Sequence, residues 1–236
     1  MSNPVFLCPD LAGDRVVLDG PEGRHAAVVV RLRVGEVLDL VDGVGTRCTG
    51  EVTQVAKDAL TVAVTSRVLE AAPSPRITVV QALAKGDRGE LAVELATEVG
   101  VDEIVPWAAA RCVVEWRGER GAKALERWRS TARAAGKQSR RAWFPVVREL
   151  ATTGQVASLP GTLLVLHEGA ETPLASVPLP GDVVLVVGPE GGVTGQELEV
   201  LQAAGATAVR LGPSVLRTST AGAAAAAVVS ARTGRW

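Results

Sequence analysis

The first seventy residues carry short apolar runs that alternate with polar positions and are separated by glycine or aspartate. The runs are rich in β-branched residues, which favours strands. They are RVVLD (15–19), AAVVVRLRV (26–34), VLDLVDG (37–43), RCTGEVTQV (47–55) and LTVAVTSRVL (60–69). Short strands with turn residues between them predict a small β-barrel over residues 1–72.

The proline-bearing segment 71–75 ends this pattern, and strands and helices alternate after it. The expected strands are ITVVQAL (77–83), EIVPW (103–107), RCVVEW (111–116), LLVLHE (163–168), DVVLVVG (182–188) and AVRLG (208–212). The expected helices cover 86–100, about 119–138, a segment from 194 and a segment from about 219. This alternation predicts a second domain over residues 77–236, an α/β domain with a largely parallel sheet.

Composition narrows the class of protein. The chain has 236 residues, 47% of them hydrophobic and 22% charged, which is typical of a soluble globular protein. Three widely spaced cysteines and two histidines argue against a disulfide framework and against a metal centre. The N-terminus lacks the pattern of a signal peptide, and the apolar run 221–229 is too short to span a bilayer. We therefore expect a cytoplasmic protein.

Positive charge is concentrated in one stretch, although the whole chain has a net charge of −1. Between Arg117 and Arg148 lie ten lysines and arginines and only two glutamates. Trp116, Trp128 and Trp143 lie among them, as aromatic platforms for stacked bases do. The imbalance favours binding to a polyanion such as RNA. The alternative is a basic face that pairs with acids elsewhere in the fold.

The segment VVLVVGPEGGVTGQEL (183–198) predicts a strand, a glycine-rich loop and a helix. Thr194 and Glu197 have the spacing of a capping box, so we expect the helix to begin there. The glycines allow a ligand to approach the backbone at the carboxyl end of the strand. The loop matches neither phosphate-binding fingerprint, and Glu190 would repel a phosphate. The alternative is a tight turn before a capped helix.

Two further loops follow expected strands. LGPSVLRTST (211–220) brings Arg217 to the same edge of the sheet, where an arginine can pair with a phosphate or stabilise an oxyanion. For this loop taken alone, an exposed arginine that caps a surface loop is the more common case. His167 ends another strand, where a histidine acts either as a base or, more commonly, as a hydrogen-bonded structural residue.

Taken together, these segments resemble a known family. VVGPEGGVTGQEL followed by VRLGPSVLRTSTA resembles the signature pair of the RsmE family, the 16S rRNA uridine-N3 methyltransferases of the SPOUT class. The PUA-like RNA-binding barrel of this family is similar to HAAVVVRLRVGEVLDLVDG (25–43). The start of its methyltransferase domain is similar to KGDRGELAVELATEVGV (85–101) and RCVVEW, and a further segment of the family is similar to KQSRRAWFP (137–145). The resemblance covers nearly the whole chain.

The resemblance implies an S-adenosylmethionine-dependent enzyme that methylates 16S rRNA, within the 30S subunit, without a metal. It also implies a homodimer and a trefoil knot in roughly 163–233. The implied cofactor residues are Leu166, His167, Glu168, Val187, Gly188, Glu190, Gly191, Gly192, Leu211, Gly212, Leu216 and Thr218. The implied RNA-binding residues are His25, Arg31, Arg33, Arg111, Gln138, Arg140 and Arg141. Arg217 is the candidate for stabilising the uracil anion, and Arg141 for contacting the target.

Two positions depart from the family pattern. The chain has Ser219 and Lys137 where the family often has glutamate, and no general base is assigned. Two alternatives stay open. One is a methyltransferase of the same class that acts on tRNA or on a ribose 2′-hydroxyl. The other is a non-catalytic RNA-binding factor for ribosome assembly.

Overall fold

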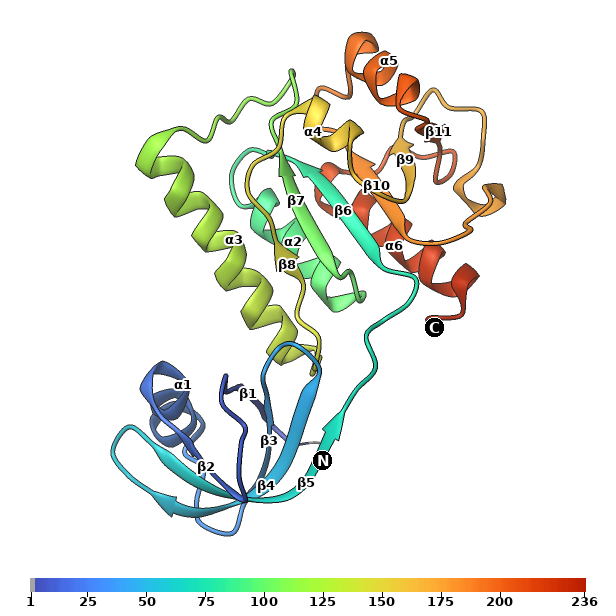
Figure 1. Ribbon diagram of the computed structural model, residues 1–236. Coiled ribbons are helices and arrows are strands. Elements are labelled where there is room, and N and C mark those ends of the chain that lie inside the picture. Colours follow the sequence, from blue (N-terminus) through green and yellow to red (C-terminus); the bar gives the residue numbers. More distant parts are fainter. Residues whose placement is uncertain (1–2) are drawn as a thin grey trace. The chain divides into compact units, whose positions relative to one another are not determined.

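The computed structural model describes residues 3–236, which form two compact units (Figure 1). The first, called here the barrel unit, contains the described residues up to Ala72 together with Gly136–Phe144. The second, called the sheet unit, contains Pro73–Ala135 and Pro145–Trp236. In the described part of the chain, no helix is both long and apolar enough to cross a membrane.

The barrel unit is built on one five-stranded sheet in the order β1-β3-β4-β5-β2. Its strands are β1 (Val5–Leu7), β2 (Arg15–Leu18), β3 (Val37–Val41), β4 (Thr46–Val55) and β5 (Leu60–Leu69). The pair β1–β3 is parallel and the other pairs are antiparallel. Alternate residues such as Leu38, Leu40 and Val62 are fully buried, as the period of two in the sequence predicts.

The expected strand at 26–34 is wrong. The helix α1 (Gly20–Arg24) continues directly into a π-helix over His25–Val30. Only Ala26 of this π-helix is buried, and Val28, Val29 and Val30 are all exposed. The β-branched run favours a strand locally, but the helix that precedes it and the burial of Ala26 in the barrel core override that preference.

A segment from the middle of the chain completes the barrel unit. Residues 136–144 include the last turn of helix α3 (Gly118–Gln138) and the chain that follows it. Trp143 bridges to Val44, and its indole N–H donates to the carbonyl of Glu70 at 3.0 Å. Lys137 forms an ion pair with Glu22, so the basic residue that departs from the family pattern has a local acidic partner.

The sheet unit contains six parallel strands in the order β11-β9-β10-β6-β7-β8. They are β6 (Ile77–Ala82), β7 (Glu103–Trp107), β8 (Val146–Val147), β9 (Thr162–Leu166), β10 (Val183–Val187) and β11 (Thr207–Val209). The parallel sheet that the sequence predicts is therefore present.

Helices cover both faces of this sheet (Figure 1). Val183, Leu185 and Val187 of β10 face a core that includes α2 (Arg88–Glu98), α3 and α6 (Thr218–Thr233). The intervening Val184 and Val186 face α4 (Thr153–Ala157) and α5 (Gly195–Ala203). A strand buried on both faces needs a continuous apolar run, which is what β10 has.

The expected strand at 111–116 is also wrong. Residues along it alternate between half-buried and exposed, as in an extended chain, but they pair with no strand among those described. The place beside β7 is taken by β8, which returns after α3. Alternation of apolar and polar residues indicates an extended backbone with one covered side, but it does not indicate that the segment pairs with another strand.

Helix α6 lies very close to the sheet. A Cβ atom at Gly222 would lie 3.1 Å from Cγ1 of Val79 and 3.3 Å from Cγ2 of Val187. Glycine at this position therefore lets the helix approach β6 and β10, and the neighbouring alanines Ala225 and Ala226 are completely buried. The alanine-rich composition of α6 is explained by this close packing.

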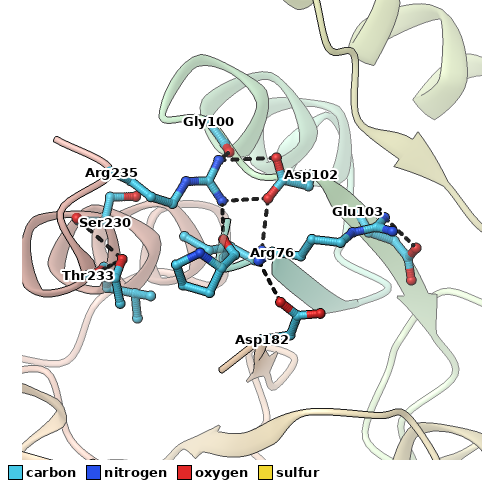
Figure 2. Close-up of polar contacts among 11 residues, drawn as sticks. Arg76, Gly100, Asp102, Glu103, Asp182, Ser230, Thr233 and Arg235 are labelled. Atoms are coloured by element: carbon cyan, nitrogen blue, oxygen red, sulfur yellow. Dashed lines mark hydrogen bonds and ion pairs between the residues drawn. The ribbon is translucent and has the colours of Figure 1, made fainter. Parts of the chain in front are cut away.

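A buried ion pair holds the chain after α6 against the amino ends of β6 and β7 (Figure 2). The guanidinium of Arg235 pairs with Asp102, and their side chains are 10% and 8% exposed. Arg235 also donates to the carbonyls of Pro75 at 2.8 Å and Gly100 at 2.7 Å. Asp102 in turn accepts the backbone N–H of Ile77, the first residue of β6. The C-terminal end of α6 is thus tied to the start of β6.

We expect Arg235→Met to lower the free energy of unfolding by about 3–5 kcal/mol, because it leaves the Asp102 carboxylate buried without its counter-ion. Arg129→Met is the matched control, since Arg129 pairs with the exposed Glu149 and its removal is expected to cost less than about 1 kcal/mol. Urea unfolding of both variants measures the difference. Equal decreases in the two variants would contradict this account.

Candidate functional site

The sheet unit has a cavity of about 500 Å³ at the carboxyl ends of β9, β10 and β11. The last residues of these strands are in register, because Leu166 pairs with both Val187 and Val209. The loops after all three strands therefore begin at the same edge of the sheet, where open α/β sheets bind ligands. The cavity is lined by all twelve expected cofactor residues, namely Leu166, His167, Glu168, Val187, Gly188, Glu190, Gly191, Gly192, Leu211, Gly212, Leu216 and Thr218.

The loop after β10 is held in a tight turn. Gly192 has a φ of 73°, and its N–H donates to the carbonyl of Pro189 at 2.9 Å. The capping box predicted for α5 is confirmed, because Thr194 and Glu197 satisfy each other's backbone N–H groups. The Glu197 carboxylate also accepts the N–H of Ala110 at 2.7 Å, which fixes this loop to the chain after β7.

The contacts of Glu190 explain why a glycine loop of this kind carries a carboxylate. Its Oε1 atom accepts the backbone N–H of Lys85 at 3.3 Å and lies 3.4 Å from Nη1 of Arg88. Lys85 lies in the turn before α2 and Arg88 is the first residue of α2, so the carboxylate lies at the helix N-terminus, where the helix dipole favours a negative charge. Glu190 therefore anchors the loop to α2, and Arg88 is a cavity residue that the sequence analysis missed.

The loop after β11 presents Arg217 to the cavity. Arg217 is the N-cap of α6, and its carbonyl accepts the N–H groups of Thr220 and Ala221 at 3.0 Å each. Its side chain is exposed and has no hydrogen-bond or ion-pair partner within residues 3–236. A free guanidinium at a helix N-terminus makes this part of the cavity attractive to an anion.

His167 has the structural character that its position at a strand end favours. Its Nδ1 atom accepts the N–H of Gly169 at 3.1 Å, so the ring is fixed within its own loop. In the chain after β7, burial raises the pKa of the Cys112 thiol, which keeps that group protonated at neutral pH. Among the described residues, no group of three or more histidine, cysteine, aspartate or glutamate side chains could hold a metal ion.

Arg111 lies at the cavity, although the sequence analysis assigned it to RNA. It donates to the carbonyl of Gly191 at 2.8 Å, and its own Cβ would lie 3.1 Å from a Cβ added at Gly191. Glycine at 191 therefore makes room for the arginine. Pro189, Pro213, Ser214 and Val215 also line the cavity and lie within the loops expected from the sequence. The cavity residues that the sequence analysis missed are Arg88, Val193, Val209, Arg210 and Ala221.

The other expected RNA-binding residues all belong to the barrel unit. They are His25, Arg31, Arg33, Gln138, Arg140 and Arg141. All are exposed except Arg141, which is half-buried and has an interaction partner. Arg31 and Arg140 have left-handed backbones, with φ of 63° and 57°. The His25 ring lies edge-on to Phe6 at a centroid distance of 5.7 Å.

Much of the basic stretch is paired with acids. Six of its ten cations form ion pairs with a glutamate, and these are Arg117, Arg127, Arg129, Arg133, Lys137 and Arg148. The expected role of Trp128 in stacking is wrong, because this side chain is 2% exposed and packs edge-on against Trp116. Most of the stretch is therefore a charged structural face, and its uncompensated charge is smaller than the sequence indicates.

The chain matches models of two domain families. Residues 71–230 match the RNA methyltransferase domain, and residues 18–65 match the RNA methyltransferase PUA domain. A ribosomal RNA small subunit methyltransferase E from Mycobacterium bovis is 46% identical over 98% of this chain and 92% of its own length. The corresponding protein from Bacillus subtilis is 28% identical over 92% of this chain and 90% of its own length.

A solved structure has the same fold over nearly its whole length. It is a ribosomal RNA small subunit methyltransferase E from Neisseria gonorrhoeae bound to S-adenosyl methionine. It superposes with a TM-score of 0.89 at 31% sequence identity and covers 98% of both chains. With both domain models and relatives of this identity matched, the chain belongs to the ribosomal RNA small subunit methyltransferase E family of RNA methyltransferases.

Proposed function

We propose that this protein transfers the methyl group of S-adenosylmethionine to N3 of one uridine in the 16S rRNA of the small ribosomal subunit. The observation that carries the proposal is the cavity at the ends of β9, β10 and β11, formed by loops of a chain in this family. The Neisseria gonorrhoeae relative was solved with S-adenosyl methionine bound, which supports the same cofactor here.

The cavity suits this cofactor chemically. Leu166, Val187 and Val209 offer apolar walls to an adenine, and the backbone of residues 188–192 offers polar atoms. Glu168 lines the cavity as an exposed carboxylate, which suits a cationic group better than a phosphate. When bound, S-adenosylmethionine supplies an electrophilic methyl group on a positively charged sulfur. The protein's task is then to hold the acceptor in line with it.

Arg217 is the residue to which we assign stabilisation of the acceptor. Uracil N3 carries a proton and is a poor nucleophile until that proton leaves. A cation beside the ring lowers the cost of forming the uracil anion. The guanidinium of Arg217 and the N-terminus of α6 both supply positive potential at the cavity, and Arg217 has no competing partner among residues 3–236.

We assign RNA binding to the barrel unit. Two segments far apart in the sequence, around Arg31 and Arg140, belong to this one compact unit, and each presents exposed arginines. Arg141 of the second segment is the candidate contact to the target.

We further propose that residues 77–236 form the methyltransferase domain with a trefoil knot in roughly 163–233. We also propose that the protein is a homodimer and that its substrate is the rRNA within the 30S subunit.

Transfer of radiolabelled methyl groups to purified 30S subunits, compared with naked 16S rRNA and with tRNA, tests the proposed function. We expect labelling of 16S rRNA, greatest in the 30S subunit, at a single uridine that mass mapping reports as methylated on the base. Labelling of tRNA or of a ribose would establish the alternative methyltransferases. A protein that binds rRNA but neither binds S-adenosylmethionine nor transfers a methyl group would be an assembly factor.

We expect Arg217→Ala to lower the rate of methyl transfer by about 10²-fold, the decrease typical of removing one group that stabilises developing negative charge. The affinity for S-adenosylmethionine, measured by calorimetry, should change little, because Arg217 is assigned to the acceptor. Arg217→Lys keeps the charge and should recover part of the rate. Normal methylation by Arg217→Ala would show that the assignment of Arg217 is wrong.

We expect removal of Arg31, Arg33 and Arg140 together to weaken binding to 16S rRNA and to make it less sensitive to salt. For single-stranded RNA, each arginine that neutralises a phosphate contributes about 0.7 to the slope of log K against log salt concentration, so its removal makes the slope shallower by that amount. The control removes Arg127, Arg129 and Arg133, which carry the same charge but pair with glutamates. Equal changes of slope in the two triple variants would contradict the assignment to the barrel unit.

A further inference from the structure

Gln81 is a polar side chain enclosed in the apolar centre of the sheet unit. It lies near the end of β6, which is flanked by β10 and β7, and it is 1% exposed. Its side chain does not line the cavity. A carboxamide in such a place is costly unless its hydrogen bonds are made. Its Nε2 atom donates to the carbonyl of Ala82 at 3.1 Å and to Oγ1 of Thr218 at 2.9 Å.

Thr218 connects Gln81 to the loop after β10. Its hydroxyl donates to the carbonyl of Gly188 at 2.8 Å, and the residue is 6% exposed. A carbonyl only accepts, so the single hydroxyl proton points to Gly188 and the Thr218 oxygen accepts from Gln81. The direction of the whole relay, from amide to hydroxyl to carbonyl, is therefore fixed by the chemistry of its three groups.

The relay joins two of the loops that form the cavity. Gly188 is the first residue after β10, and Thr218 is the first residue of α6, next to Arg217. The two residues are 30 positions apart in the sequence. One buried amide on a central strand thus sets the position of both relative to the sheet.

We propose that Gln81 is a positioning residue for methyl transfer. Through Thr218 it holds the Gly188 carbonyl and the N-terminus of α6 in the arrangement that the cofactor binds, so the site is organised before the ligand arrives. This inference rests on the proposed function for the identity of the ligand. Preorganisation of this kind raises affinity, because the loops do not have to be ordered on binding.

The test uses variants that keep the shape of each group and remove its hydrogen bonds. Gln81→Met removes the donor to Thr218, and Thr218→Val removes the hydroxyl. Gln81→Glu keeps the size but gives Thr218 an acceptor, so the hydroxyl is drawn away from Gly188. We expect each variant to raise the dissociation constant of S-adenosylmethionine by about 10-fold or more, the change expected when a buried hydrogen-bond partner is removed. Thr218→Ser keeps the hydroxyl and should therefore recover most of the affinity that Thr218→Val loses.

A double variant distinguishes a relay from two separate contacts. If Gln81 acts through Thr218, Gln81→Met combined with Thr218→Val should be no weaker in cofactor binding than Thr218→Val alone. Thr97→Val is the structural control, because this buried threonine of α2 donates to the carbonyl of Val93 at 2.7 Å away from the cavity. It should lower the melting temperature without changing cofactor affinity.

The outcomes separate the two proposals. If the unaltered protein does not bind S-adenosylmethionine, the proposed function fails. If it binds and methylates rRNA, but the folded Gln81 variants bind equally well or the two substitutions act additively, only the relay is overturned.

Discussion

The register of three neighbouring parallel strands is the constraint on which the site depends. Leu166, Val187 and Val209 are aligned at the ends of β9, β10 and β11, so three loops leave the sheet side by side. Each loop contributes residues of a different kind to the cavity: a histidine and a carboxylate, a glycine-rich turn, and an apolar stretch that ends in Arg217. None of these loops encloses a ligand alone, and a shift of one strand would separate them.

Polar contacts hold the elements that form the cavity. Glu197 ties the loop after β10 to the chain after β7, and Glu190 ties the same loop to the start of α2. At the other end of α6, Arg235 and Asp102 hold the helix to the start of β6 (Figure 2). Helix α6, which follows Arg217, is therefore fixed at its far end by a buried ion pair and along its length by close contact at Gly222.

Most of the loops that form this site could be predicted from the sequence, because the patterns that indicate them each lie within a short segment. A strand, a turn and a capping box each lie within a few residues, and the loops around Gly188 and Arg217 were found this way. Contacts between distant segments were not predictable. Nothing near Glu190 in the sequence indicates Arg88, and nothing near Trp143 indicates that residues 136–144 pack with the barrel unit. The valines at 28–30 favoured a strand, and only the helix before them and the burial of Ala26 explain why they form none.

The central claim is that the cavity at the strand ends binds S-adenosylmethionine, and a crystal structure of the protein grown with this cofactor tests it most directly. The account predicts the ligand against residues 188–192, with its adenine between Leu166, Val187 and Val209 and its methyl group open to the side of Arg217. A cofactor bound elsewhere, or a cavity without ligand in crystals of a protein that binds it in solution, would contradict the account.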